Sequence, residues 1–175
     1  PIGDGGEAKI YAVALSPADG NLILSVRHQD WVIKIYYRNG AGDGHVVWRL
    51  GQGGDFAVNS ADPNPWFSHQ HNAHYIDDHT LILLDNGNTR QASDPNAHSR
   101  GQVWTLDEAN MTASLVVNAD LGSHSGALGA AERLSNGNYS FTLGTNGPVP
   151  PAPVRPPSHT VEVTPTGLKT FDLQG

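Results

Sequence analysis

Closely spaced histidines are the first feature of the sequence that points to chemistry. The chain has nine histidines, and His69, His71 and His74 stand within one short stretch. Two histidines on one side of a strand, with a carboxylate such as Asp85, would suit zinc. Side chains alternate along a strand, so His74 faces away from His69 and His71. Since no HExxH pattern occurs, we expect no metal, and a hydrogen-bonded structural pair is the competing interpretation for His69.

A second candidate is the stretch Asp85-Asn86-Gly87-Asn88-Thr89-Arg90. Asn and Gly tolerate the backbone angles of tight turns, so the stretch predicts a turn. A planar guanidinium such as that of Arg90 suits a sulfate, a phosphate or a carboxylate. The alternative is an arginine that pairs with Asp85 or braces its own loop.

Composition limits the classes of partner. The 175 residues suffice for one domain. A formal net charge of −7 without a basic run disfavours nucleic acid and anionic membranes as partners. The absence of cysteine excludes disulfides, thiol nucleophiles and thiolate metal sites. No apolar run approaches the roughly 20 residues of a membrane span.

The sequence predicts strands, because no window shows a sustained 3.6-residue spacing of apolar residues. Short β-branched and aromatic runs are bounded by Gly, Asn, Asp and Pro, which is typical of strands. Glu108–Met111 carries a weak helical signal that we discount. The twelve predicted strands are Lys9–Ser16, Asn21–His28, Trp31–Tyr37, His45–Leu50, His71–Ile76, Thr80–Asp85, Gly101–Asp107, Thr112–Asn118, Leu128–Leu134, Tyr139–Gly144, His159–Val163 and Leu168–Leu173.

Three similar tight turns divide these strands into groups of four. They end at Asn21, Thr80 and Asn138, which are 59 and 58 positions apart. A repeat of this size with four antiparallel strands is typical of a β-propeller, and a β-sandwich is the alternative. We predict an all-β fold, a single partial β-propeller domain over 1–175 with blades at about 9–50, 69–118 and 127–174. Three blades are half of a six-bladed ring, so further blades or a second copy would close it.

The long connections of such a propeller fall on one face. They are Gly51–Gln70, Gly87–Arg100, Ala119–Ala127 and Thr145–Ser158. Loops on a rigid scaffold carry function more often than the scaffold does, so we expect His71 and Arg90 to converge there. Gly51, Gly53 and Gly54 follow a strand, but no helix follows them, which argues against a phosphate loop. We interpret the segment Pro148–Pro157 as a stiff, polyproline-like loop covering one face rather than a docking site.

Several stretches together resemble the arylsulfotransferase family. They run in family order between Asn21 and Asn138, and they are Leu24–Ile35, Trp48–Gly51, Phe67–Asn72, Leu84–Arg90, Ser99–Gly101 and Arg133–Asn138. The resemblance implies a six-bladed propeller that transfers a sulfuryl group from an aryl sulfate to a phenol through a sulfated histidine. It also implies a secreted or periplasmic protein without a metal or organic cofactor.

The resemblance also assigns site residues. The histidine of the Gln-His-Asn motif carries over to His71, and the arginine after Asp-Asn-Gly-Asn to Arg90. The family places a further channel histidine where this chain reads Ala8-Lys9-Ile10-Tyr11.

The full expected site has two parts. The expected catalytic residues are His71, Arg90 and His124, with His124 as a candidate nucleophile, and the expected substrate-binding residues are Arg27, His28, His69, Asn72 and Asn88. Trp66 and Phe67 would either flank an aromatic ring or pack in the core. A non-catalytic β-propeller that only binds, or an inactive fragment, is the alternative function.

Overall fold

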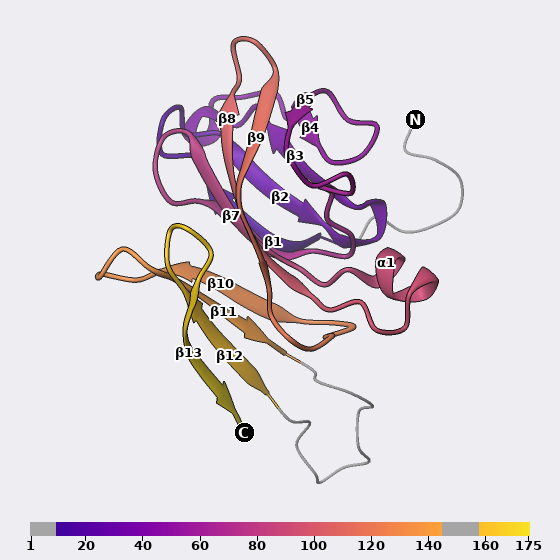
Figure 1. Cartoon of the computed structure of the whole chain (residues 1–175). Helices are drawn as coiled ribbons and strands as arrows, with labels where there is room; N and C mark the ends of the chain where they lie inside the picture. Colours follow the sequence, from indigo (N-terminus) through magenta and orange to yellow (C-terminus); the bar gives the residue numbers. More distant parts are fainter. Residues whose placement is uncertain (1–9, 145–157) are drawn as a thin grey trace, which may run out of the picture.

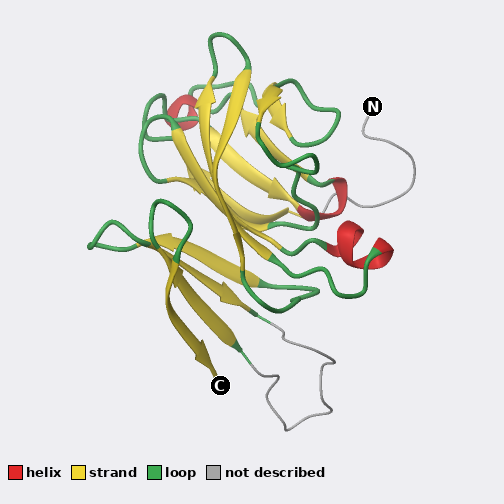
Figure 2. Cartoon of the chain, viewed as in Figure 1, coloured by secondary structure: helices red, strands yellow, loops and turns green. Residues whose placement is uncertain are grey.

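The computed structural model describes residues 10–144 and 158–175, and it is almost entirely β (Figures 1 and 2). The only α-helix among these residues is α1 (Asn88–Ser93), and two 3-10 turns, η1 (Arg27–Gln29) and η2 (Arg38–Gly40), accompany it. The segment Pro148–Pro157 lies outside the described residues. The strands are β1 (Ile10–Leu15), β2 (Leu22–Val26), β3 (Trp31–Ile35), β4 (Val46–Leu50), β5 (Ala57–Asn59), β6 (His71–Tyr75), β7 (Thr80–Asp85), β8 (Arg100–Asp107), β9 (Thr112–Asp120), β10 (Gly129–Arg133), β11 (Tyr139–Leu143), β12 (His159–Val163) and β13 (Lys169–Gln174).

These strands form three sheets, each built from strands that are consecutive in the sequence. The first sheet has the order β1-β2-β3-β4, the second β5-β9-β8-β7-β6 and the third β10-β11-β12-β13. All pairs are antiparallel except β5 with β9, which is parallel. The predicted all-β fold is therefore confirmed, and the strands fall into three consecutive sheets. The second sheet departs from the predicted set of four antiparallel strands because β5 adds a fifth, parallel strand. A closed ring is not formed by the described residues.

The predicted turns join β1 to β2, β6 to β7 and β10 to β11. At the first of them Gly20 has φ +67°, a conformation that glycine adopts without strain. At the second, the Asp77 carboxylate accepts hydrogen bonds from the backbone N–H groups of His79 (2.9 Å) and Thr80 (2.7 Å). The aspartate thus replaces backbone partners inside the turn.

The middle sheet is apolar on both faces, which explains the unbroken apolar run in β7. Leu81 and Leu83 pack into the cluster shared with the first sheet, and Ile82 and Leu84 into the cluster shared with the third. All four are fully buried. A strand with both faces covered shows no apolar–polar alternation, so β7 reads as a continuous apolar segment.

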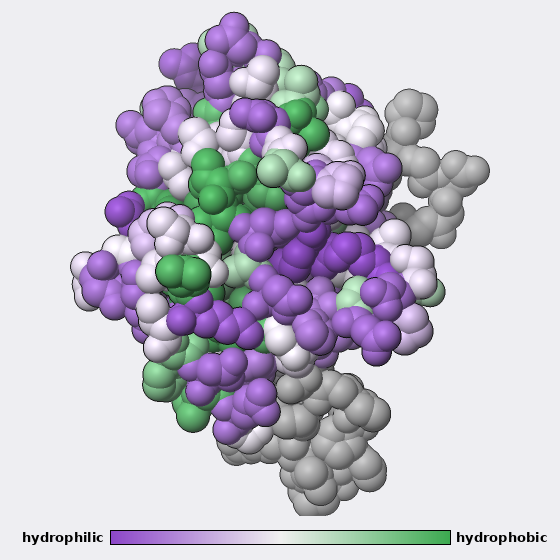
Figure 3. Space-filling model, in the orientation of Figure 1, coloured by the Kyte–Doolittle hydropathy of each residue, from purple (hydrophilic) through white to green (hydrophobic). Residues whose placement is uncertain are grey.

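The two outer sheets each leave one apolar surface uncovered. In β1, Val13 is 60% and Leu15 52% exposed, and in β13, Phe171 is 51% and Leu173 56% exposed. Figure 3 shows hydrophobic residues at the surface over the sheet β10–β13. Exposed apolar faces of this kind are typical of surfaces that a partner covers.

Two elements were placed in loops by the sequence analysis. The predicted loop Gly51–Gln70 contains β5, which adds to the edge of the second sheet beside β9. The predicted loop Gly87–Arg100 contains α1, which begins directly after Gly87 in a left-handed conformation (φ +75°). Both elements are so short that no periodicity could reveal them.

Candidate functional site

Four chain segments meet at one end of the sheets. Arg27 follows the end of β2, His71 begins β6, Asp85 ends β7, and the segment 123–128 leads into β10. Antiparallel neighbours bring the end of one strand beside the start of the next, so these segments lie together, as the loop analysis predicted.

The first group of side chains is basic. The Arg27 guanidinium lies 3.0 Å from His28 Nε2, and it donates a 2.7 Å hydrogen bond to the carbonyl of Gly126. The rings of His28 and His69 meet edge to face, with centroids 5.8 Å apart. The Asn88 amide donates to the same Gly126 carbonyl at 3.0 Å. Arg27, His28, His69 and Asn88, all expected to bind substrate, therefore share one location.

His69 is held by an aspartate of the neighbouring loop. The Asp30 carboxylate accepts a 2.6 Å hydrogen bond from the His69 backbone N–H, and the same oxygen lies 3.2 Å from His69 Nδ1. Both residues have left-handed backbones, with φ 54° for Asp30 and 55° for His69. Such conformations in residues other than glycine cost energy and cluster at functional sites.

His71 is buried beside this group and fixes a loop. Its Nδ1 lies 2.7 Å from the Asn86 amide oxygen, and its Nε2 accepts a hydrogen bond from the Leu128 backbone N–H at 3.3 Å. These contacts define a neutral ring with its proton on Nδ1. Asn86 in turn donates to the carbonyls of Ser125 and Leu128. His71 thereby ties β6 to the segment that also holds Arg27.

The pKa values of three histidines of the site, His69, His71 and His124, are lowered, which keeps these rings neutral near pH 7. Burial lowers the pKa of His71, and nearby Arg27 adds to this effect. Burial also lowers the pKa of His69, together with Arg27 and His28 and against Asp30, which raises it. Burial and the charge of Arg90 lower the pKa of His124. Neutral imidazoles retain the lone pair that nucleophilic or base catalysis requires.

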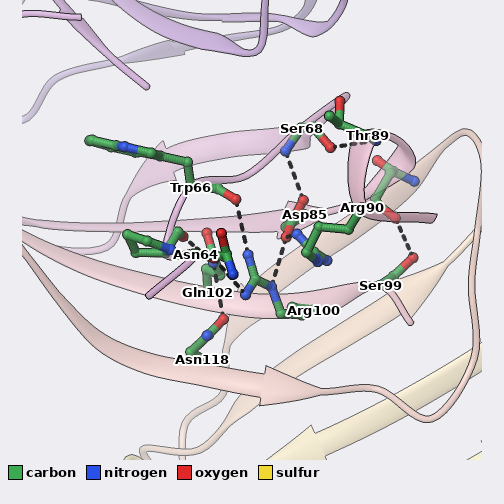
Figure 4. A network of polar contacts seen from close by, with 12 residues as sticks. Asn64, Trp66, Ser68, Asp85, Thr89, Arg90, Ser99, Arg100, Gln102 and Asn118 are labelled. Carbon is green, nitrogen blue, oxygen red and sulfur yellow. Dashed lines mark hydrogen bonds and ion pairs between the residues drawn. The ribbon is translucent and has the colours of Figure 1, made fainter. Parts of the chain in front are cut away.

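The second group surrounds Asp85, which is fully buried (Figure 4). One carboxylate oxygen accepts from Arg90 at 2.6 Å and from Arg100 Nε at 2.9 Å, and the other accepts from the Ser68 backbone N–H at 2.9 Å. Arg90 also donates to the carbonyl of His98. Arg90 therefore pairs with Asp85 and braces its own loop, which is the alternative stated for it above.

Arg100 is a residue of this network whose contacts the sequence analysis did not foresee. It donates to the Asp62 carboxylate at 2.8 Å and to the carbonyls of Asn64 and Trp66. It thus fastens the connection between β5 and β6 against the middle sheet. Two sequence signals pointed to it: its position directly before a predicted strand, and its place in the family-like stretch Ser99–Gly101.

The remaining expected residues are distributed around the two groups. The Asn72 amide oxygen accepts from the Ala131 backbone N–H at 2.8 Å and so joins β6 to β10. His124 lies near Arg90 and Asp85, whose charges affect its pKa. His71 and Arg90 contact adjacent residues, Asn86 and Asp85, and no hydrogen bond joins them in the part of the chain described.

The structure also locates Trp66 and Phe67 and the histidines that were considered as zinc ligands. The Trp66 ring stacks on Trp104 with centroids 5.4 Å apart, and Phe67 is buried, so both pack in the core. His74 Nδ1 lies 3.0 Å from the Asn72 carbonyl, away from His69. Across residues 10–144 and 158–175, no group of three or more His, Asp or Glu residues has the arrangement of a metal site.

Buried polar atoms without hydrogen bonds gather at this end of the molecule. They include Gln29 Oε1, Asn88 Oδ1 and His124 Nε2. Most buried polar groups in proteins are satisfied, so each such atom calls for an explanation.

Fold and site together define an all-β protein with an arginine–histidine site at one end of its sheets. Among solved structures, a protein of unknown function from Bacteroides caccae is similar, with a TM-score of 0.51 and 11% sequence identity. The match covers 97% of this chain but 47% of that one, so the chain spans about half the length of that protein. This likeness concerns the fold alone.

The family is given by sequence. The family model for arylsulfotransferase (ASST) matches residues 10–167, which is most of the chain. The chain therefore belongs to the arylsulfotransferase family. No curated protein matches it, and no helix among the described residues is long and apolar enough to cross a membrane.

Proposed function

We propose that the chain carries part of an arylsulfotransferase site, which transfers a sulfuryl group from an aryl sulfate to a phenol. The observation that carries this proposal is the group of Arg27, His28 and His69 at the loop end of the sheets. A guanidinium near the neutral imidazole of His69 suits the transfer of a sulfuryl group. That group is planar during transfer and needs both hydrogen-bond donors and a nucleophile.

The proposed reaction has two balanced steps. A histidine nitrogen attacks the sulfur of the aryl sulfate, the N–S bond forms, and the S–O bond breaks with its electron pair leaving on the phenolate. The acceptor phenol then attacks the same sulfur, the N–S bond breaks, and the phenolic proton passes to a base. Such covalent catalysis divides one difficult transfer into two easier ones.

His69 is the best-placed nucleophile in the described structure. Its Nδ1 side faces Asp30, its side chain is 26% exposed, and burial keeps its pKa below the ordinary value. A nucleophilic ring oriented by a carboxylate is the general arrangement of an activated histidine. Arg27 would bind the sulfonate oxygens and stabilise their charge during transfer.

The residues expected from the family have roles in the same proposal. His71, with Nδ1 beside Asn86 and Nε2 bonded to Leu128, positions the loop that holds Arg27. Arg90 anchors the neighbouring loop through Asp85 and contributes positive charge beside His124. His124 is the alternative nucleophile, because burial and Arg90 keep it neutral. No metal or organic cofactor is needed, whether His69 or His124 is the nucleophile.

Two further parts of the proposal concern assembly and location. The exposed apolar faces of β1 and β13 would be covered by further blades or by a second copy, which would close a propeller ring. As in the family, we propose that the protein works outside the cytoplasm, in the periplasm or after secretion.

A second candidate function is a module that binds an anion without turning it over. The observation that favours it is the engagement of Arg90 by Asp85 and of His71 by Asn86 and Leu128. Residues bound in this way build a scaffold as readily as they build a catalyst. Binding of an aryl sulfate without release of its phenol would distinguish this module from the enzyme.

The test is release of 4-nitrophenol from 4-nitrophenyl sulfate, with and without phenol as acceptor. We expect acceptor-dependent release, and a loss of roughly 10²–10³-fold in Arg27→Ala, the usual effect of removing one transition-state donor. Arg38→Ala is the matched control, because Arg38 is exposed at the opposite end of the first sheet. Equal rates in the two variants would contradict the assignment of Arg27.

A further inference from the structure

A serine, a histidine and an aspartate form a chain of hydrogen bonds at the third sheet, and none of them has a role in the proposed sulfuryl transfer. Ser123 Oγ lies 2.7 Å from His159 Nδ1, and His159 Nε2 lies 2.6 Å from Asp172 Oδ1. His159 is 1% exposed, whereas Ser123 retains some exposure to solvent. A nucleophile, a base and a carboxylate in this order are the general arrangement of an activated serine.

The strand register brings the histidine and the aspartate to one face of the sheet. His159 begins β12 and pairs with Gln174 of β13. Asp172 stands two positions before Gln174, so its side chain projects from the same face as that of His159. Ser123 reaches this face from the connection between β9 and β10. Its carbonyl accepts a 3.0 Å hydrogen bond from the Ser99 backbone N–H, which fixes the backbone that carries the hydroxyl.

These hydrogen bonds define which nitrogen of the neutral ring carries the proton. A carboxylate only accepts, so His159 Nε2 donates its proton to Asp172. Nδ1 then holds a lone pair, and the Ser123 hydroxyl donates to it. The hydroxyl proton therefore points at a base, and the oxygen lone pairs are left for an electrophile. The two ring nitrogens are used in the reverse order from the best-known serine hydrolases, but the roles follow from the hydrogen bonds and not from the position of the nitrogen.

Two backbone donors stand next to the serine hydroxyl in the chain. Among the described residues, the backbone N–H groups of Ser123 and His124 have no hydrogen-bond acceptor. In serine hydrolases the backbone N–H of the nucleophile itself donates to the oxyanion that forms on its substrate. The same N–H of Ser123 is therefore free to stabilise a negative oxygen on a carbon bonded to Oγ.

We propose that Ser123, His159 and Asp172 form a second catalytic group, which hydrolyses carboxylic esters. Ser123 Oγ attacks the carbonyl carbon of the ester, and His159 Nδ1 takes the hydroxyl proton. The ester C–O bond then breaks, and the alcohol leaves with that proton. Water attacks the acyl–serine, its proton passes through His159 to Ser123 Oγ, and the carboxylic acid is released. Asp172 is a positioning residue, because it holds the ring in the tautomer that leaves Nδ1 unprotonated.

Labelling with an alkyl fluorophosphonate tests the activation of the serine. An activated serine displaces fluoride from the phosphorus and keeps the phosphonyl group as a stable ester. We expect a single label on Ser123, located by fragmentation mass spectrometry, and no label in Ser123→Ala. His159→Gln should lower the labelling rate by roughly 10²–10⁴-fold, the usual effect of removing a general base. Ser140→Ala is the matched control and should be labelled like the wild type, because Ser140 is a half-buried serine of the same sheet, on β11.

Substitutions of Asp172 separate activation from a purely structural link between strands. Asp172→Asn keeps the size of the side chain, but its amide can donate to His159 Nε2 and so favours a ring whose proton faces Ser123. We expect labelling to fall by roughly tenfold or more in Asp172→Asn and by less in Asp172→Glu, which keeps the carboxylate. The Asp172 side chain is 43% exposed, so both variants should fold, which circular dichroism checks. They decide the matter even if His159→Gln does not fold.

Hydrolysis of 4-nitrophenyl acetate then tests the reaction itself. We expect an acid quench to trap an acetyl group on Ser123, and Ser123→Ala to lose both this adduct and the hydrolysis above the level of the buffer. An unlabelled wild type, a label or acetyl group on another serine only, or equal labelling rates in the wild type and Asp172→Asn would overturn the proposal. Neither measurement depends on turnover of 4-nitrophenyl sulfate, so this proposal and the proposed sulfuryl transfer can fail separately.

Discussion

The substitution Asp85→Asn tests how far one buried carboxylate organises the site. Asp85 is fully buried and receives hydrogen bonds from Arg90, Arg100 and the Ser68 backbone N–H. Asparagine has nearly the same shape but no charge. The change therefore leaves the guanidinium groups of Arg90 and Arg100 facing a neutral partner in a site largely screened from water.

The expected cost is large compared with total stability. Breaking a buried ion pair by neutralising one partner costs about 3–5 kcal/mol. Small domains are stable by about 5–15 kcal/mol in total. Arg100 retains the Asp62 carboxylate at 2.8 Å, so we expect the lower half of the range, about 3–4 kcal/mol.

The assay is equilibrium unfolding in urea, followed by tryptophan fluorescence and circular dichroism. The control is Asp55→Asn, which breaks a bidentate ion pair with Arg49 at an exposed position. Exposed pairs contribute little, so the control should lose far less stability than Asp85→Asn. Equal losses in the two variants would refute the view that Asp85 organises this end of the molecule.

Four further predictions concern pH, packing, turnover and association. The pKa of His71 lies below its ordinary value of 6.5. The contribution of neutral His71 to stability is therefore fully present above pH 6.5 and is lost as the pH falls through the folded-state pKa. The difference between the urea midpoints at pH 7.5 and pH 5 should be smaller in His71→Gln than in the wild type. Gly101→Ala sets a methyl group against the ring of Phe141 and should cost about 1–3 kcal/mol in urea unfolding, whereas an unchanged midpoint would show that the two sheets can separate. Arg90→Ala should lower turnover more than Arg90→Lys, because lysine keeps the charge; the reverse order in the nitrophenol assay would exclude a role for that charge. Sedimentation should show self-association of the chain that Val13→Lys reduces, and a monodisperse wild-type monomer would contradict a partner-covered β1 face.

The strand pattern of this chain could be predicted because each signal was local. Turn residues at Asn21, Thr80 and Asn138 recur at nearly equal spacing, and each is followed by a β-branched or apolar run. A tight turn depends on a few neighbouring residues, so it can be predicted from the sequence. The parallel strand β5 was missed because its partner strand, β9, is more than fifty positions away.

The sequence predicted that several candidate residues lie near one another, but it did not predict their contacts. Arg27, His28 and His69 were expected to bind substrate, and the structure places them together. The sequence did not decide whether Arg90 binds a ligand or pairs with Asp85, because residue spacing does not determine which of two partners a guanidinium contacts. The contacts of Arg100 were not predicted because its partner Asp62 is brought near only by the fold.

The central claim is that a histidine beside Arg27 carries the sulfuryl group between donor and acceptor. Its most direct test is to incubate the protein with 4-nitrophenyl sulfate, quench in alkali and locate the adduct by fragmentation mass spectrometry. The account predicts one sulfuryl group on His69, absent from Arg27→Ala and removed when phenol is added before the quench. A sulfuryl group on another residue, or none while 4-nitrophenol is released, would contradict it.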